Sequence, residues 1–344
     1  MDGPAAQEPH RAAGVITRTT GLLVAVVALG FVVLTGIWLG TKDISFLETW
    51  RVLWHPDGSP DSIIIHDYRV PRTILGLLVG AALGLSGALM QALTRNPLAD
   101  PGLLGVSLGA SSGVVVAIAF VGVSGVLGYV WFAFVGAAIA AVVVYLLGSA
   151  GRTLATPERL VLAGAAVTAV LYAFNTAVLL VDPRAFNQFR FWNAGSLAGR
   201  DYDVVTALLP FLAVGIALAL ALARPLNVLA LGEEMSRALG ANVGRTRIAG
   251  AVAVTLLCGA ATAAAGPIGF VGLAVPHVAR LIVGPDQRWV LPYTLVLSPI
   301  LLIGSDTLGR VIGSPGEVQV GIVTAFVGAP VFLALCRRRK LSAL

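Results

Sequence analysis

The sequence has little charge for its length. Only 12% of its 344 residues are Asp, Glu, Lys or Arg, whereas soluble domains carry about 25%. Hydrophobic residues make up 57% of the chain, and its mean hydropathy is +0.90. This balance excludes an ordinary soluble domain and indicates an integral membrane protein. The 40 glycines agree, because small residues let membrane helices approach one another closely.

Reactive side chains are also scarce. Cys258 and Cys336 lie within apolar runs and are expected to be packing residues, so neither a disulfide framework nor a redox pair is predicted. The four histidines have no metal-binding or catalytic spacing, and we predict no metal site and no catalytic residue. A membrane-embedded enzyme would need a cluster of reactive His, Cys, Ser or carboxylate groups, which the sequence does not show.

Groups that could supply energy are missing as well. A phosphate-binding loop needs a lysine after a glycine, and neither Lys42 nor Lys340 follows one. Ion-coupled carriers commonly place ionisable residues in the membrane, but here the main exception is Asp306 with Arg310, four residues apart and able to pair. An ion-coupled secondary carrier remains the rival interpretation. If transport is active, its energy must come from another chain, and we expect no cofactor bound here.

Long apolar segments dominate the rest of the chain. A helix needs about 20 apolar residues to cross about 30 Å of hydrocarbon. The eighth candidate is short and follows the seventh across Gly266-Pro267, a break that survives where protein or a water-filled cavity satisfies the backbone. The predicted fold class is all-α integral membrane with ten transmembrane helices, at 19–40, 71–92, 103–122, 126–149, 160–181, 204–223, 248–266, 268–283, 289–311 and 318–336.

The distribution of Lys and Arg predicts the orientation. With the N-terminus inside, fifteen of the 23 cations fall in cytoplasmic segments and eight fall outside. Both termini are therefore predicted to be cytoplasmic, with a polar tail at 1–18, a single ten-helix domain at 19–340 and a short tail at 341–344. Because most of the net charge of +6 reflects topology, membrane lipid is an expected partner and nucleic acid is not.

Two octamers suggest a weak inverted repeat. "GAALGLSG" (80–87) and "GAATAAAG" (259–266) share the pattern G-A-A-x4-G and lie five spans apart, so the two copies would run in opposite directions. Inverted repeats are common in transporters. A chance match in a chain rich in Gly and Ala explains the similarity equally well.

A charged segment interrupts the apolar chain at 229–247, "LALGEEMSRALGANVGRTR". Leu231-Gly232 and Leu239-Gly240 bracket a short predicted helix. Its wet face would hold Glu233, Glu234 and Arg237, and its apolar face Met235, Ala238 and Leu239. A short amphipathic helix at the cytoplasmic side can dock into a groove of a partner; a solvated loop is the alternative.

Four stretches, in this order, resemble a known family: "RVPRTILGLLVGAALGLSGALMQALTRNPLADPGLLGVSLGAS" (69–111), "LGEEMSRALG" (231–240), "GPIGFVGLAVPHVARLIVGPDQRWVLP" (266–292) and "GAPVF" (328–332). They are similar to the FecCD-type permeases of ABC importers for iron siderophores, haem and vitamin B12, over about 20–340. The long stretches are specific, whereas the last alone would not be.

The resemblance implies a transport subunit and not an enzyme. It implies a second permease subunit, identical or related, with the path between the two. It also implies two ATPase subunits that carry ATP and Mg, a separate external binding protein, and a place in the bacterial plasma (inner) membrane. A ferric siderophore is the expected cargo, and vitamin B12 and haem stay open.

The resemblance also implies roles for single residues. The coupling segment at 224–247 would enter a cleft of the ATPase through Leu231, Gly232, Glu233, Glu234, Arg237, Leu239 and Gly240. Carboxylates of the binding protein would meet Arg69, Arg72 and Arg310, since guanidinium holds carboxylate with two hydrogen bonds. For Arg310, the alternative is a pair with Asp306. For Arg69 and Arg72, the alternative is anchoring of the second span at the membrane interface.

The gates are the last set of residues implied by the resemblance. Asn96 and Leu98 of the "NPLADP" turn would narrow the inner mouth together with Thr156, although Pro157 and Glu158 depart from the expected local sequence. The outer gate segment at 182–203 includes Phe191 and Trp192. Both aromatic residues would serve equally well as interfacial anchors.

Overall fold

The computed structural model describes residues 8–123, 125–149 and 157–337, and every regular element in these ranges is helical. The helices of the first half are α1 (Glu8–Trp38), α2 (Phe46–Trp54), α3 (Pro60–Ile63), η1 (Ile64–Arg69), α4 (Val70–Thr94), η2 (Pro101–Leu104), α5 (Val106–Val116), η3 (Ala117–Val121), α6 (Val126–Gly148) and α7 (Pro157–Val181). Those of the second half are α8 (Pro183–Asn193), α9 (Tyr202–Ala221), α10 (Ala223–Ala230), α11 (Glu233–Ala238), α12 (Val243–Ala265), α13 (Val271–Val283), α14 (Gln287–Ile312) and α15 (Val320–Arg337).

The protein is an all-helical, multi-span membrane protein. Within the described ranges, seven helices are long and apolar enough to cross a membrane: Gly14–Trp38, Pro60–Thr94, Leu127–Gly148, Arg159–Val181, Tyr202–Ala221, Val243–Ala265 and Gln287–Ile312. Three shorter apolar helices are Val106–Val121, Val271–Val283 and Val320–Leu333. Each of the ten apolar segments predicted from the sequence therefore contains a helix.

The boundaries differ from the prediction in several places. The first helix begins at Glu8, so part of the predicted polar tail is helical. The second predicted span is part of one longer helical run, Pro60–Thr94, because a π-helical stretch continues the chain into α4. The third is divided among η2, α5 and η3. The predicted tail at 341–344 lies outside the described residues.

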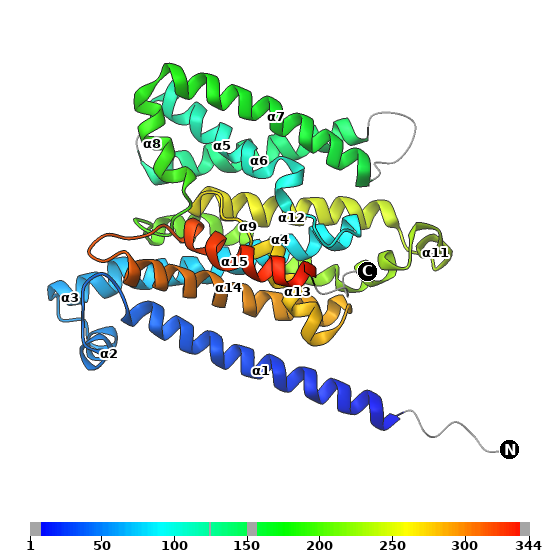
Figure 1. The fold of residues 1–344 in the computed structure, drawn as a ribbon, viewed down its shortest axis with the longest axis horizontal. Coiled ribbons are helices and arrows are strands. Elements are labelled where there is room, and N and C mark those ends of the chain that lie inside the picture. The colour runs from blue at the N-terminus through cyan, green and yellow to red at the C-terminus, as the bar shows by residue number, and fades with distance from the viewer. Residues whose placement is uncertain (1–7, 124, 150–156, 338–344) are drawn as a thin grey trace.

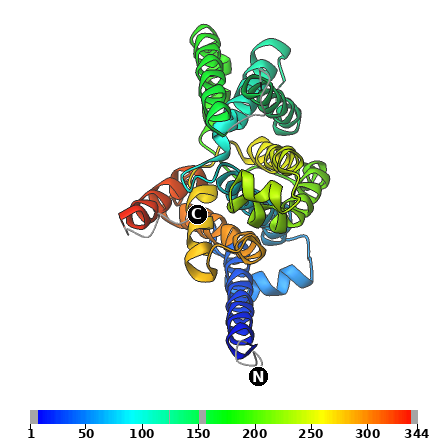
Figure 2. The same ribbon diagram turned by 90° about the vertical axis from the view of Figure 1, so that its right-hand side faces the viewer.

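The long helices lie side by side, and short elements gather at the two ends of the bundle (Figure 1). One end holds α2, α3 and α8, and we call it the α8 end. The opposite end holds α11 and the first turns of α1, and we call it the α11 end. Figure 2 views the bundle from the α11 end, with the helices seen nearly end-on and the green α7 at its edge.

The centre of the bundle is α4, whose most apolar window is 83% buried. Its face toward α14 is made of glycine: a Cβ at Gly80 would lie 2.7 Å from Pro299 Cα, and one at Gly76 would lie 2.9 Å from Ile303 Cγ1. These small residues let the two backbones touch, which is how membrane helices gain contact where lipid offers no hydrophobic driving force. The two octamers of the predicted repeat lie on α4 and α12, which pack against each other.

Candidate functional site

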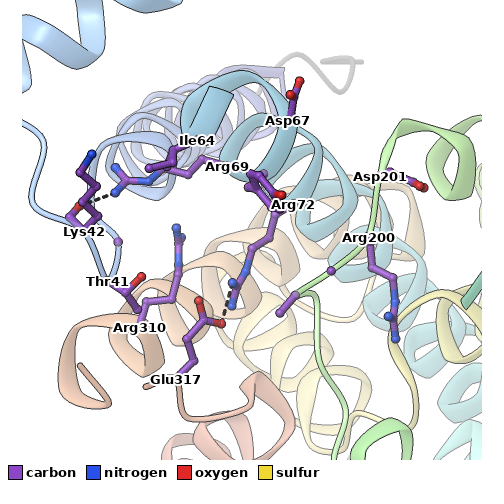
Figure 3. A pocket seen from close by; sticks show the side chains of 14 residues that line it. Thr41, Lys42, Ile64, Asp67, Arg69, Arg72, Arg200, Asp201, Arg310 and Glu317 are labelled. Carbon is purple, nitrogen blue, oxygen red and sulfur yellow. Dashed lines mark hydrogen bonds and ion pairs between the residues drawn. The ribbon is translucent and has the colours of Figure 1, made fainter. Parts of the chain in front are cut away.

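At the α8 end, charged and polar groups line a cavity of about 440 Å³. Figure 3 shows these side chains, which come from η1, α4, α14 and the joining loops. The cationic residues of the lining are Lys42, Arg69, Arg72, Arg200 and Arg310, and the anionic ones are Asp67, Asp201 and Glu317. The fold thus brings together the three arginines predicted to contact a binding protein.

Arg72, at the start of α4, is held by two carboxylates. Its Nε and Nη2 donate to the two oxygens of Asp306 at 2.9 and 2.7 Å, and its Nη1 donates to Glu317 at 2.8 Å. The side chains of Arg72 and Asp306 are only 10% and 3% exposed. The predicted pair between Asp306 and Arg310 is present at 3.2 Å. The two-pronged contact nevertheless belongs to Arg72, so the main bond of Asp306 joins α14 to α4.

Arg69 and Arg310 hold the C-terminal end of α1. Arg310 donates to the carbonyls of Leu39 and Gly36 at 2.9 and 3.0 Å, and Arg69 donates to the carbonyl of Ile37 at 3.2 Å. The last carbonyls of a helix lack intrahelical partners and carry partial negative charge, which favours a cation. Both arginines are buried within the chain. Any carboxylate of a partner would therefore reach them through the cavity and not on an open surface.

Arg200 is a further member of this cluster that the sequence analysis did not single out. Its Nε donates to the carbonyl of Ala264 at 2.7 Å, in the last turn of α12, and burial lowers the pKa of Arg200. The neighbouring Ser196 N–H donates to Ala265 at 2.7 Å. The segment after α8 is thus bonded to the end of α12. In the sequence, Arg200 looks like any other cation between two apolar runs.

The two aromatic residues of the predicted outer gate have different surroundings. Phe191 is 60% exposed, with the Arg190 guanidinium 4.7 Å from the centre of its ring. Trp192 is 3% exposed and lies 5.9 Å from Phe189, ring centre to ring centre. Burial makes Trp192 a packing residue of α8 in the described chain, which does not fit an aromatic anchor at the membrane surface.

At the α11 end, the charged segment forms the predicted short helix. Gly232 and Gly240 flank α11 with φ of +99° and +78°, values that glycine adopts without strain. The side chains of Leu231, Met235 and Leu239 are more than half exposed. The described part of the chain therefore leaves the apolar face of α11 exposed.

One polar residue attaches α11 to the bundle. Ser236 is fully buried, and its hydroxyl lies 2.7 Å from the Val228 carbonyl of α10 and 2.5 Å from the Gly232 carbonyl. Glu233 accepts from Arg237 at 2.6 Å and from Arg247 of α12 at 3.3 Å. Ser236 could not be singled out from the sequence, because a serine in a polar segment gives no sign of burial.

The predicted inner mouth is described in part. Asn96 accepts from the Leu98 N–H at 2.9 Å and so closes the turn after α4, and Leu98 is 53% exposed. Thr156 lies outside the described residues. Nearby, Gln91 is fully buried and donates to the Gly272 carbonyl of α13 at 3.2 Å, while Arg280 of α13 donates to the Gln91 side-chain oxygen. Nothing in the sequence around Gln91 indicates this connection between α4 and α13.

A second connection joins α10 to the start of α14. Asn227 donates to Asp286 at 2.6 Å and accepts from the Gln287 N–H at 2.8 Å. Arg288 donates to both oxygens of Asp286. Hydrogen bonds from Arg288 first and Asn227 second lower the pKa of Asp286 to about 2. The base of the α11 segment is thereby fixed to the bundle, whereas its tip is exposed.

The FecCD transport family matches residues 26–338. The chain belongs to the FecCD transport family. This FecCD chain is 50% identical to the ferric enterobactin transport system permease protein FepD of Escherichia coli (strain K12) over 282 residues, which cover 82% of this chain and 84% of that protein. It is 35% identical to the hemin transport system permease protein HmuU of Yersinia pestis over 312 residues, with 88% and 90% covered.

A solved structure has the same fold as this FecCD chain. It is described as an inward-facing conformation of a metal-chelate type ABC transporter, and it matches with a TM-score of 0.82 and 26% identity, covering 92% of this chain and 99% of that one. The FecCD chain is therefore the permease subunit of an ABC importer and not an enzyme. It is a multi-pass protein of the bacterial inner membrane, and a permease of this kind implies ATPase and binding-protein partners.

Proposed function

We propose that the chain imports a ferric siderophore that an external binding protein delivers. The observation that carries this cargo is the 50% identity to the ferric enterobactin permease. A probable siderophore permease, YfiZ of Bacillus subtilis (strain 168), is 39% identical over 319 residues, and covers 92% of this chain and 96% of that protein. Vitamin B12 and haem are the alternative cargoes. Haem has less support than a ferric siderophore, because the identity to the hemin permease is 35%.

In this proposal the chain crosses the membrane ten times as a single domain at 19–340. The α11 end is cytoplasmic, as are both termini, and the α8 end faces outward. The seven long and three shorter apolar helices support the count, and the excess of Lys and Arg supports the orientation. An inverted repeat would relate α4 to α12, consistent with the placement of the two octamers on these helices.

A second permease subunit, identical or related, would cover the exposed face of α7. The most apolar window of α7 is only 11% buried, and Leu162, Val170 and Leu180 are each at least 69% exposed. On α15, Phe326 is 78% exposed. The transport path would run between the two subunits, with Phe191 and Trp192 near its outer mouth and Asn96, Leu98 and Thr156 near its inner mouth.

Two ATPase subunits would supply the energy, and ATP and Mg would bind to them and not to this chain. The apolar face of α11 supports this. Among the described residues, Leu231, Met235 and Leu239 are more than half exposed, which suits a groove of a partner. Glu233, Glu234 and Arg237 would contact the rim of that groove. Because Ser236 attaches α11 to α10, closure of the ATPase pair would move both helices together and switch the path.

The binding protein would dock at the α8 end. A carboxylate that enters the cavity would meet Arg69, Arg72 and Arg310, and would compete with Asp306 and Glu317 for the hydrogen bonds of Arg72. Charge pairs of this kind favour orientation and association rate over affinity. We expect the association rate to fall as salt rises. A rate that does not depend on salt would refute docking through these arginines.

Reconstitution tests the energy source. The complete complex in proteoliposomes should concentrate cargo when ATP is supplied. This uptake should stop when the phosphate-loop lysine of the ATPase is changed. Uptake by the chain without an ATPase, or uptake abolished by a proton ionophore while ATP stays high, would favour an ion-coupled carrier.

Two further measurements test the cargo and the coupling segment. Thermal protection of the complex, with its binding protein, by a ferric siderophore but not by haem or vitamin B12 would support the cargo; the reverse pattern would replace it. In a variant with Glu233→Arg and Arg237→Glu, we expect normal folding but ATP hydrolysis that no longer drives uptake. Normal uptake in this variant would contradict the role of α11.

A further inference from the structure

An apolar groove of about 340 Å³ runs between α6 and α12. Its walls include Phe134, Val142 and Leu146 of α6 and Ile248, Val252 and Leu256 of α12. Four of these six side chains are also among the exposed large hydrophobic residues, so the groove opens on the surface of the bundle. Because both helices are long enough to span the membrane, this surface faces either lipid or another chain.

One end of the groove carries a positive charge. Arg247 is the charged member of the lining in the described part of the chain, and its side chain is 13% exposed. It lies in the second turn of α12, at the α11 end. Arg245 and Arg159 are exposed at the same end, the latter beside Leu160 of the groove lining.

The shape and the charge together fit one kind of ligand. A narrow apolar groove that ends in a guanidinium matches a molecule with a long hydrocarbon chain and an anionic head. Guanidinium binds phosphate with two parallel hydrogen bonds. Basic pockets between membrane helices on the cytoplasmic side are suited to acidic phospholipid headgroups.

We propose that this groove is a binding site for an anionic phospholipid, with an acyl chain between α6 and α12 and the phosphate on Arg247. The site would lie at the cytoplasmic leaflet, beside the coupling segment. It rests on the proposed orientation of the chain and not on which cargo the chain carries.

The bound lipid would also act on α11. Arg247 reaches Glu233 of α11 at 3.3 Å, and Glu233 has a closer partner in Arg237 at 2.6 Å. A phosphate on Arg247 competes with the longer of these two ion pairs, so Glu233 can stay with Arg237 when the lipid binds. The lipid thereby weakens a contact between α12 and α11, and the charge of the inner leaflet would adjust how firmly the coupling segment is held.

Lipid retention tests the site directly. The complete complex is purified in detergent, given equal amounts of phosphatidylglycerol and phosphatidylcholine, washed, and examined by native mass spectrometry. We expect phosphatidylglycerol to be retained about fivefold better, the effect of one cation near an anionic lipid. Arg247→Ala should abolish this preference and Arg247→Lys should keep part of it. Arg245→Ala, two residues away on the exposed side, is the matched control and should change little.

A second variant separates the loss of lipid binding from misfolding, because it is expected to raise retention and not to lower it. Glu233→Gln removes the competing carboxylate and keeps Arg247, so it should raise retention of phosphatidylglycerol. Equal retention of both lipids by the wild-type complex, or an unchanged preference in Arg247→Ala, would overturn the proposal. So would a photocrosslinker at Val252 that captures a protein subunit in place of lipid.

Discussion

The two ends of the molecule use charge in opposite ways. Around the cavity at the α8 end, Arg69, Arg72, Arg200, Arg310 and Asp306 are buried, and each bonds to a group in another segment of the chain. At the α11 end, Glu234 and Arg237 are exposed, and so are the apolar side chains of Met235 and Leu239. The charges of the cavity are bonded within the chain, whereas α11 presents a polar and apolar surface that the described residues leave exposed.

This contrast separates groups whose loss should affect the fold first from groups whose loss should affect assembly first. A buried ion that loses its partner is strongly destabilising, because the remaining charge has no solvent. An exposed ion pair contributes little to stability. Changes at the α8 end should therefore appear first in the stability of the chain, and changes at the tip of α11 in its assembly and transport.

The largest effect is expected from Asp306→Ala. This change leaves Arg72 and Arg310 buried without their shared carboxylate, and should cost about 3–5 kcal/mol of unfolding free energy. Thermal unfolding in detergent, followed by size-exclusion chromatography, measures it. Glu317→Gln is the control, because Glu317 is 34% exposed and should cost far less. An Asp306→Ala protein as stable as its parent would show that the buried charges at the α8 end do not stabilise the fold more than the exposed charges of α11 do.

A smaller effect, on assembly only, is expected from Met235→Ala with Leu239→Ala. Truncating two apolar side chains of a docking surface should weaken binding of the ATPase about tenfold. The unfolding temperature should stay the same, since both side chains are more than half exposed. Phe31→Ala on α1 removes an equally exposed apolar side chain and should leave ATPase binding intact. A stability loss in the double variant would show that this face is covered.

Ser236→Ala tests the comparison between the two ends from within the α11 end, because Ser236 is a buried polar residue in a helix that is otherwise largely exposed. Loss of its hydroxyl contact to the Val228 carbonyl should cost about 1 kcal/mol. The loss should be local, so hydrogen exchange should rise in α11 and α10 but not in α4. Uniformly faster exchange over the bundle would contradict local anchoring.

The smallest effect concerns pH at the base of the α11 segment. The pKa of Asp286 is lowered from its ordinary value of 3.8 to about 2, so its contribution to stability is complete above the higher value and is lost as pH falls toward the lower one. The unfolding temperature of the wild-type chain should drop over this range more steeply than that of Asp286→Asn. Identical slopes would mean that Asp286 has no such partners in solution.

Much of the helical layout could be read from the chain itself. Apolar segments of spanning length correspond to helices because unsatisfied backbone groups are too costly in hydrocarbon. Gly232 and Gly240 predicted the ends of α11, since glycine adopts positive φ without strain. The family resemblance, which rests on long ordered stretches, is confirmed by the match over 26–338.

The roles of single side chains could not be read in this way. Phe191 and Trp192 are neighbours in the chain, yet one is exposed and the other is buried under Phe189. Gln91, Arg200 and Ser236 carried no signal, although each bonds to a helix other than its own segment. The proposed roles of the gate and docking residues stay predictions.

The sequence by itself determined the class of the molecule, its apolar segments and the exposed helix between the sixth and seventh of them, because these follow from local composition and backbone chemistry. Only the tertiary structure decided which charges meet. Asp306 bonds chiefly to Arg72, 234 residues away, and not to Arg310 one turn along. Such partners depend on how close two packed helices come, and the glycines that allow this approach show their effect only when the helices are together.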